Sequence, residues 1–286
     1  MTFLENIYYK MFRTGSKLYL LIGINVIVFL AIIIPGQLEK LMFRSDLIDT
    51  YTTDYLSLPS YLPKLLTRFW TPITYMFIHS GFFHILFNML WLYWMGQIFE
   101  EFLGEKRTVG LYLLGGLAGA FLYVASYNIF PAFTQSGLVL VSSAVGASAA
   151  VMAIVVGAAT IAPDYTIVFM FIGPVKLKWL VLVFLVIDYL GITGPNAGGE
   201  ISHIGGAIFG FIYVRQLQRG RDMVGAISGL FKSRSKLKVV ANNNNKSSAD
   251  TPRQDEIDRI LDKISKNGYE SLSKQEKEIL FRASKK

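Results

Sequence analysis

The sequence contains no cysteine, and this absence removes several classes of chemistry. Disulfide bonds, a thiol nucleophile and thiolate metal ligands are all excluded. Charge is also scarce, because 17% of the residues are Asp, Glu, Lys or Arg, whereas 52% are hydrophobic. Soluble globular domains carry about 25% charged residues. This balance favours a membrane protein over a soluble enzyme.

Long apolar stretches recur between Leu18 and Val214, and a bilayer-crossing helix needs roughly 20 mostly apolar residues. Six spans are predicted, at about residues 18–34, 82–96, 109–129, 148–161, 175–190 and 201–217. We expect Pro35-Gly36 to end the first span, which reads as a retained helix because no small-residue cleavage site follows it. The predicted fold is therefore all-α, a polytopic membrane helix bundle with six transmembrane helices.

The connecting segments differ in character. The loop at 37–71 is long and mixes charges with aromatics, so we expect it to be partly structured at the membrane interface. Residues 100–107 are predicted to form a short charged connector, and residues 191–199 a flexible loop. The chain is thus divided into an N-terminal cytoplasmic segment at 1–17, a membrane core at 18–217, a basic and Asn/Ser-rich linker at 218–252 and a small helical hairpin at 253–286.

The hairpin is predicted from two short patterns. Ile257, Ile260, Leu261 and Ile264 follow helical spacing, and Asn267-Gly268 ends the pattern. Ser273 and Glu276 then fit a capping box at the start of a second short helix.

The net charge of +8 arises after residue 212, because basic and acidic residues balance before it. A basic tail that follows a last span is typical of the cytoplasmic side of a membrane. Six spans place both termini on one side, so we expect both in the cytoplasm, with the protein in a cell membrane such as the bacterial inner membrane. Nucleic-acid binding by the tail is the alternative, but no recognition motif accompanies the charge, and no nucleic-acid partner is expected.

The chain has only three histidines, His79, His84 and His203, and all fall at predicted outer ends of membrane helices. Ser148 opens the fourth predicted span. Spans two, four and six all enter from outside, so His84, Ser148 and His203 are predicted to share one depth. Ionisable residues inside a membrane are costly and usually mark function. Their shared depth predicts a hydrolytic site just below the outer surface.

A serine hydroxyl is a poor nucleophile unless a base takes its proton, and His203 is the candidate base for Ser148. Small residues on both helices would permit the close approach that this requires. They are Ala149, Ala150, Ala153 and Gly157 on the fourth span, and Gly205, Gly206, Ala207 and Gly210 on the sixth. The alternative is ordinary small-residue packing, with Ser148 bonded to backbone.

Donors for a developing oxyanion are also predicted. Ser148 begins a helix, whose first backbone N–H groups have no partner within the helix. His84 and Asn88 are four residues apart on one helix face and can donate toward the same point. The alternative is that these two are buried polar residues bonded to each other or to backbone.

Asp188 is the only acid well inside a predicted span. It could orient His203, although we expect it to reach the interface or to bond locally. A zinc site built from the three histidines is poorly supported, because His79 and His84 are five residues apart and no HExxH motif occurs. No metal and no cofactor are predicted.

Three short motifs occur in order on spans two, four and six: His84-Ile85-Leu86-Phe87-Asn88, Gly146-Ala147-Ser148-Ala149, and His203-Ile204-Gly205-Gly206 followed by Gly210. Together, over residues 18–217, they resemble the motifs of the rhomboid family of intramembrane serine proteases. The resemblance implies a catalytic dyad with Ser148 as nucleophile and His203 as base. It implies oxyanion donors from the Ser148 backbone and from the His84 and Asn88 side chains. Gly146, Gly206 and Gly210 support these motifs.

The implied substrates are membrane-anchored proteins in the lipid bilayer, cut at or near small residues where a helix can unwind. The implied gate involves the fifth span and the 191–199 loop; no cofactor is implied, and Asp188 is not expected to be catalytic. The chain departs from the family pattern with Ala149 where many members have glycine, with Met152 where some have tyrosine, and with Arg68-Phe69-Trp70 near the place of a Trp-Arg pair.

Two alternatives remain. A rhomboid-like pseudoprotease would bind membrane clients without cutting them. Such members usually lack the serine or the histidine, whereas this chain has both. A transporter or channel would need polar residues through the membrane thickness, whereas here they gather at one depth.

Overall fold

The computed structural model describes residues 5, 8–9, 16–169, 173–226 and 254–284. The chain divides into two compact units, Met1–Lys232 and Ser233–Lys286, each of which is treated by itself. Most of the predicted 1–17 and 218–252 segments lie outside the described residues.

The first unit is built on six helices that coincide with the six predicted spans. They are α2 (Lys17–Phe43), α6 (Phe82–Leu103), α7 (Lys106–Ile129), α10 (Ser148–Ile161), α11 (Leu177–Gly191) and α12 (Ala197–Gln218). Helices α2, α6 and α7 are long and apolar enough to cross a membrane, and α10 is a shorter apolar helix. The predicted all-α membrane helix bundle is confirmed.

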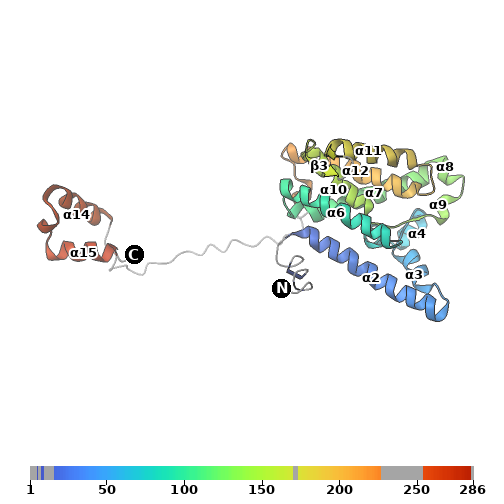
Figure 1. The fold of residues 1–286 in the computed structure, drawn as a ribbon, viewed down its shortest axis with the longest axis horizontal. Helices are drawn as coiled ribbons and strands as arrows, with labels where there is room; N and C mark the ends of the chain where they lie inside the picture. Colours follow the sequence, from blue (N-terminus) through green and yellow to red (C-terminus); the bar gives the residue numbers. More distant parts are fainter. Residues whose placement is uncertain (1–4, 6–7, 10–15, 170–172, 227–253, 285–286) are drawn as a thin grey trace. The chain divides into compact units, whose positions relative to one another are not determined.

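Helix α10 lies inside the bundle, where it contacts α6, α7, α11 and α12, while α2 packs along α6 (Figure 1). Most α10 residues are buried, and they are small or β-branched, such as Ala150, Ala153 and Ile154. A helix with apolar residues on every face is typical of such an interior position. The first residue of this central helix, Ser148, is therefore held by neighbours on several sides.

Short elements complete the unit. They are α3 (Leu47–Tyr55), β1 (Leu58–Pro59), α4 (Leu62–Thr67), α5 (Thr71–Thr74), η1 (Tyr75–Phe77), α8 (Pro131–Thr134), α9 (Leu138–Val141), β2 (Ser143–Ala144), β3 (Thr166–Phe169) and β4 (Gly173–Lys176). Strand β1 pairs antiparallel with β2, and β3 with β4. The β1–β2 pair joins the long first loop to the segment that precedes Ser148.

The predicted end of the first span at Pro35-Gly36 is wrong, because α2 continues through Pro35 to Phe43. A proline inside a helix removes one backbone hydrogen bond but does not always end the helix. Beyond it, Gly36 packs beside Ile48 and Asp49 of α3, and Lys40 forms an ion pair with Asp49. These contacts hold the extension in helical form.

The predicted connector at 100–107 is also largely helical. Helix α6 continues to Leu103, and the break falls at Gly104, whose φ of 78° favours glycine. The Glu100 carboxylate accepts hydrogen bonds from Ser16 Oγ at 2.7 Å and from the Leu18 N–H at 3.1 Å. A carboxylate at the N-terminus of α2 satisfies a backbone donor that has no partner in that helix. Glu100 thus serves as a cap for a neighbouring helix.

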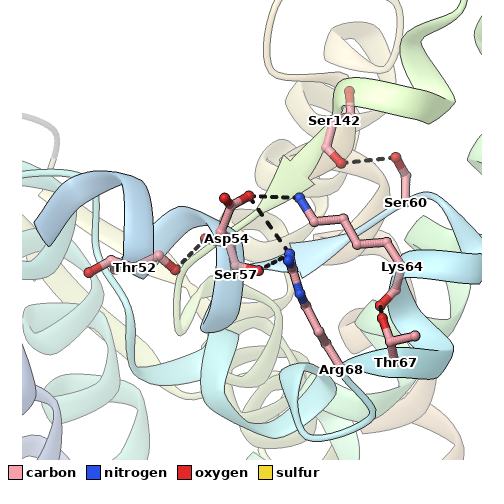
Figure 2. A network of polar contacts seen from close by, with 8 residues as sticks. All are labelled: Thr52, Asp54, Ser57, Ser60, Lys64, Thr67, Arg68 and Ser142. Carbon is pink, nitrogen blue, oxygen red and sulfur yellow. Dashed lines mark hydrogen bonds and ion pairs between the residues drawn. The ribbon is translucent and has the colours of Figure 1, made fainter. Parts of the chain in front are cut away.

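The loop after α2 is partly structured, as predicted, and a polar network organises it (Figure 2). Lys64 Nζ donates to Asp54 Oδ1 at 2.9 Å, and Arg68 bonds to the Asp54 carbonyl oxygen and lies 4.5 Å from the centre of the Tyr55 ring. Trp70 Nε1 donates to the Tyr55 carbonyl oxygen at 2.7 Å. The Lys64 ammonium, with a smaller contribution from Arg68, lowers the pKa of the Asp54 carboxyl. Arg68 and Trp70 therefore fasten the C-terminal end of α3.

We predict that Arg68→Ala lowers the thermal midpoint of the detergent-solubilised protein by about 2–4 °C. Three contacts of one side chain are lost together, with the Asp54 carbonyl oxygen, the Asp54 carboxylate and the Tyr55 ring. Arg68→Lys keeps the charge but loses the planar contact with Tyr55. Its thermal midpoint is expected to lie between those of wild type and Arg68→Ala. Differential scanning fluorimetry measures the shift. An unchanged midpoint in Arg68→Ala would show that the loop is held by other contacts.

The second unit contains α14 (Gln254–Asn267), η2 (Tyr269–Ser271) and α15 (Lys274–Ser284). The predicted capping box is confirmed, because the Glu276 N–H donates to Ser273 Oγ at 3.2 Å and the Ser273 N–H donates to Glu276 Oε2 at 2.7 Å. Lys263 Nζ of α14 donates to Glu276 Oε1 at 2.9 Å. The Lys263 ammonium first, and the Ser273 groups second, lower the pKa of Glu276 to about 2.

This lowered pKa predicts an acid-sensitive hairpin. The stabilisation by ionised Glu276 is fully present above the ordinary pKa of 4.5 and is lost as pH falls toward about 2. In limited pepsin digestion of the whole protein, we expect cleavage within 254–284 to rise over this window relative to Glu276→Gln, which lacks the titrating group. Glu270→Gln, at an exposed carboxyl, should behave as wild type. Parallel pH profiles for wild type and Glu276→Gln would contradict the prediction.

Candidate active site

The four residues predicted as nucleophile, base and side-chain oxyanion donors line one cavity of about 430 Å³ in the first unit. Ser148 comes from α10, His203 from α12, and His84 and Asn88 from α6. Three helices that are far apart in sequence thus bring these side chains together, in agreement with the shared depth that the sequence predicts.

Ser148 is the first residue of α10, as predicted, and the chain reaches it through a constrained turn. The Gly146 N–H donates to the Tyr75 carbonyl oxygen at 2.9 Å, which fixes this turn to η1. Gly146 has a φ of 129°, and a Cβ there would lie 2.8 Å from His84 Nε2 and 3.4 Å from Ser148 Oγ. Glycine is therefore required by both backbone conformation and space, because the His84 ring occupies the place of a side chain.

The hydrogen bonds of His84 assign its tautomer. Its Nδ1 faces Ser80, with the Ser80 Oγ at 3.0 Å and the Ser80 backbone nitrogen at 3.4 Å. A backbone N–H can only donate, so Nδ1 accepts and the neutral ring carries its proton on Nε2. This Nε2 lies beside Gly146, two residues before Ser148. His84 is thus arranged to donate a hydrogen bond into the cavity beside the serine.

Asn88 lies one helical turn after His84 and is buried. Its Nδ2 donates to the His84 carbonyl oxygen at 2.8 Å. An amide nitrogen carries two hydrogens, so one donor remains for the cavity that Asn88 lines. The bond to backbone fixes the orientation of this amide.

Helix α12 begins at Ala197, so His203 lies in its second turn. The prediction that His203 lies in the first turn of this helix is wrong. The Asn196-Ala197-Gly198-Gly199 stretch resembles a loop in sequence, yet Gly198 packs against Tyr123 and Tyr127 and belongs to the helix. His203 Nδ1 lies 3.0 Å from Asp188 Oδ1 of α11. The expectation that Asp188 reaches the interface is also wrong, since its side chain is buried.

Ser148 and His203 share the cavity, but they are not paired by a hydrogen bond among the described residues. Hydrogen bonds of this kind are often long without substrate and shorten when it binds. The lack of a direct bond in this structure therefore does not separate the two groups as members of one site.

Close packing of α12 fixes the relative depth of these residues. A Cβ at Gly206 would overlap the carbonyl oxygen of Ala149, and a Cβ at Gly210 would overlap that of Ala153. On another side, Gly205 lies against the backbone of Ala118 and Gly119 in α7. The backbones touch at these positions, as small residues at helix contacts permit. Any slippage of α12 would therefore move His203 relative to Ser148.

The Rhomboid domain matches residues 66–219, which is more than half of the chain. The chain belongs to the rhomboid family. The matched region of this rhomboid protein contains every predicted site residue, and its apolar helices show that it is a membrane protein. Residues 244–286 match a family of unknown function (DUF6576).

A curated relative of this rhomboid protein is "RHOMBOID-like protein 12, mitochondrial" of Arabidopsis thaliana. It is 30% identical over 161 residues, which cover 54% of this chain and 48% of the relative. The chain thus spans about half the length of the curated relative that it matches. The family resemblance read from the motifs is confirmed by the domain match.

One aromatic contact in the cavity wall of the rhomboid domain joins α6 to α11. The rings of Trp91 and Phe184 meet edge to face with their centres 4.8 Å apart, and both line the cavity. Of the residues of α11, Leu177, Val181 and Asp188 are buried. Helix α11 is therefore the most weakly embedded wall of the site. Met152, where some members of the family have tyrosine, lines the same cavity as His203.

The sequence prediction missed Glu200, which lies close to Asp188 and His203. One side-chain oxygen each from Asp188 and Glu200 and one ring nitrogen of His203 lie within 4.8 Å of one another. Such a set could hold a divalent cation, whereas the three histidines do not form such a group in the described part of the chain. The available signal was spacing, since Glu200 and His203 are three residues apart on one helix face.

Proposed function

We propose that this rhomboid protein is an intramembrane serine endopeptidase, which hydrolyses peptide bonds in or near transmembrane segments of membrane-anchored proteins. The observation that carries the proposal is the convergence at one cavity of Ser148, His203 and the Nε2 of His84. A nucleophile, a base and an oxyanion donor are what acyl transfer to serine requires.

The proposed reaction has two halves. Ser148 Oγ attacks the scissile carbonyl carbon while His203 Nε2 takes the hydroxyl proton, and the tetrahedral intermediate then expels the amine, which receives that proton. Water next attacks the acyl-enzyme, and His203 accepts a proton from the water and returns it to Ser148 Oγ as the carboxylic acid leaves. Both residues end in their starting states, and one water is consumed for each peptide bond.

The negative charge of each tetrahedral intermediate would be stabilised by three kinds of donor. The backbone N–H of Ser148 stands at the start of α10, where the helix dipole is positive. The His84 Nε2–H faces the same point, and Asn88 retains one amide hydrogen. Donors fixed in a site with little water are more effective than donors in solution, so these groups would supply much of the rate enhancement.

The cavity walls support a membrane-embedded substrate. Phe83, Phe87, Trp91 and Phe184 line it together with the polar groups. A substrate helix would have to unwind there, because its carbonyl groups are otherwise bonded within the helix. Glycine and serine favour helix less than alanine does, so they would make unwinding easier. We propose entry between α6 and α11, which the Trp91–Phe184 contact joins. The charge bias supports a multi-pass protein of a cell membrane with both termini cytoplasmic.

A reconstituted cleavage assay tests this function. Wild type and Ser148→Ala are placed in lipid vesicles with single-span proteins that carry small residues near the outer membrane surface. The proposal expects defined fragments from wild type alone, with cleavage sites located by mass spectrometry in or beside the span. Stable binding of these proteins without cleavage would overturn it and favour the client-binding alternative.

A further inference from the structure

We propose that Asp188 is a positioning residue, which holds His203 in the tautomer and orientation that a base requires. This inference rests on the proposed function and extends it, because that function assigns no role to an acid. It makes the arrangement a chain of three groups, Ser148, His203 and Asp188, from three different helices.

The geometry of the Asp188–His203 contact fits this role. Asp188 Oδ1 lies 3.0 Å from His203 Nδ1, and the exposed fractions of the two side chains are 9% and 19%. A carboxylate can only accept, so the hydrogen between the two atoms belongs to Nδ1. The neutral imidazole then has its free electron pair on Nε2, at the opposite edge of the ring. Asp188 therefore selects the tautomer that can take a proton from Ser148.

The charge of the Asp188 carboxylate also fits this role. When His203 takes the serine proton, a positive charge forms on a side chain that is 19% exposed, where water screens it less than in bulk solvent. A buried carboxylate at hydrogen-bond distance stabilises this imidazolium and does not itself take the proton. The other titratable groups at this site are His84 of α6 and Glu200 of α12. His84 donates toward Ser148 and cannot serve this purpose, so Asp188 is the acid bonded to the base.

Glu200 of α12 is a second acid at this site. One side-chain oxygen each of Asp188 and Glu200 and one ring nitrogen of His203 lie within 4.8 Å of one another. Asn196 Nδ2 donates to Glu200 Oε1 at 3.3 Å, whereas Asp188 Oδ2 is buried and has no hydrogen-bond partner among the described residues. Among these residues, the bond from His203 to Oδ1 is therefore the one that orients the Asp188 carboxyl group.

The test compares Asp188→Asn, Asp188→Ala and Asp188→Glu with wild type, using the labelling rate with a fluorophosphonate probe and kcat and KM in vesicles. Asn can donate its amide hydrogen to Nδ1 and so favour the wrong tautomer. We expect Asp188→Asn to lower both the labelling rate and kcat by about 100-fold to 10,000-fold, with KM little changed. Asp188→Glu should recover part of the rate. Tyr189→Phe, on an exposed side chain of the same helix, is the control and should match wild type.

The outcomes distinguish the role of Asp188 from the proposed protease function. Equal labelling of Asp188→Asn and wild type would overturn the role of Asp188 while leaving the protease proposal intact. A rate loss that only follows a lowered thermal midpoint, or that appears in KM rather than kcat, would also overturn it. A response of wild type to EDTA that Asp188→Asn lacks would identify a metal site instead. Failure of wild type to label and to cleave would overturn the proposed function itself.

Discussion

Replacing Ser148 with alanine is expected to lower kcat for cleavage of a membrane-anchored protein by about 1,000-fold or more, with the fold retained. Alanine removes the hydroxyl oxygen that forms the acyl-enzyme, and none of the other cavity side chains at the start of α10 can replace it. The backbone N–H at this position remains, so substrate binding and KM should change little. Measurement in vesicles at several substrate densities separates kcat from KM.

The matched control for this substitution is Ser143→Ala, an exposed serine of β2 in the segment that leads to α10. It should cleave at the wild-type rate. Since Ser148 Oγ makes no hydrogen bond within the described residues, the thermal midpoints of all three proteins should agree within about 2 °C. Substantial cleavage by Ser148→Ala would assign the nucleophile elsewhere.

Replacing Gly206 with alanine is expected to damage both the fold and the site. The added Cβ would overlap the Ala149 carbonyl oxygen, so α12 has to move away from α10. Overpacking of this kind typically costs about 1–3 kcal/mol. Ala149 follows Ser148 directly, and a displacement of about 1 Å between reacting groups can lower a rate about 100-fold. Both the thermal midpoint and the fluorophosphonate labelling rate should therefore fall.

Gly36→Ala is the matched control for this second prediction. Gly36 is also in a helix, but a Cβ there would meet its nearest neighbours at 3.6 and 3.7 Å, which is ordinary contact. Alanine favours helix over glycine by about 1 kcal/mol, so this variant should be as stable as wild type or more stable. Equal stability and equal labelling of Gly206→Ala and wild type would show that α10 and α12 can separate without cost.

The helices were predicted well from the sequence where neighbouring residues along the chain specify them. Long apolar runs specified the six helices, and Ser273 with Glu276 specified the start of α15. The boundaries that were wrong depend on distant contacts. Pro35 stays inside α2 because the helix beyond it packs on α3, and Glu100 stays helical because its carboxylate caps α2. A short stretch of sequence around Pro35 or Glu100 does not show these distant contacts.

The same distinction applies to the site. Ser148, His203, His84 and Asn88 could be placed at one depth because helix direction alternates along the chain, and they line one cavity. Ser80, which fixes the tautomer of His84, carries no pattern that separates it from ordinary polar residues, and the only signal for Glu200 was its spacing of three residues from His203. The Asp188–His203 bond requires the neighbouring positions and rotations of α11 and α12, which periodicity does not supply.

The central claim is that His203 activates Ser148, and covalent labelling tests it most directly. Purified wild type, Ser148→Ala and His203→Ala are incubated with a fluorophosphonate probe, and the modified residue is identified by mass spectrometry of peptides. The account predicts an adduct on Ser148 of wild type, no adduct at that position in Ser148→Ala, and labelling of His203→Ala slower by about 1,000-fold or more. Folded wild type without an adduct on Ser148, or His203→Ala labelled at the wild-type rate, would contradict the account.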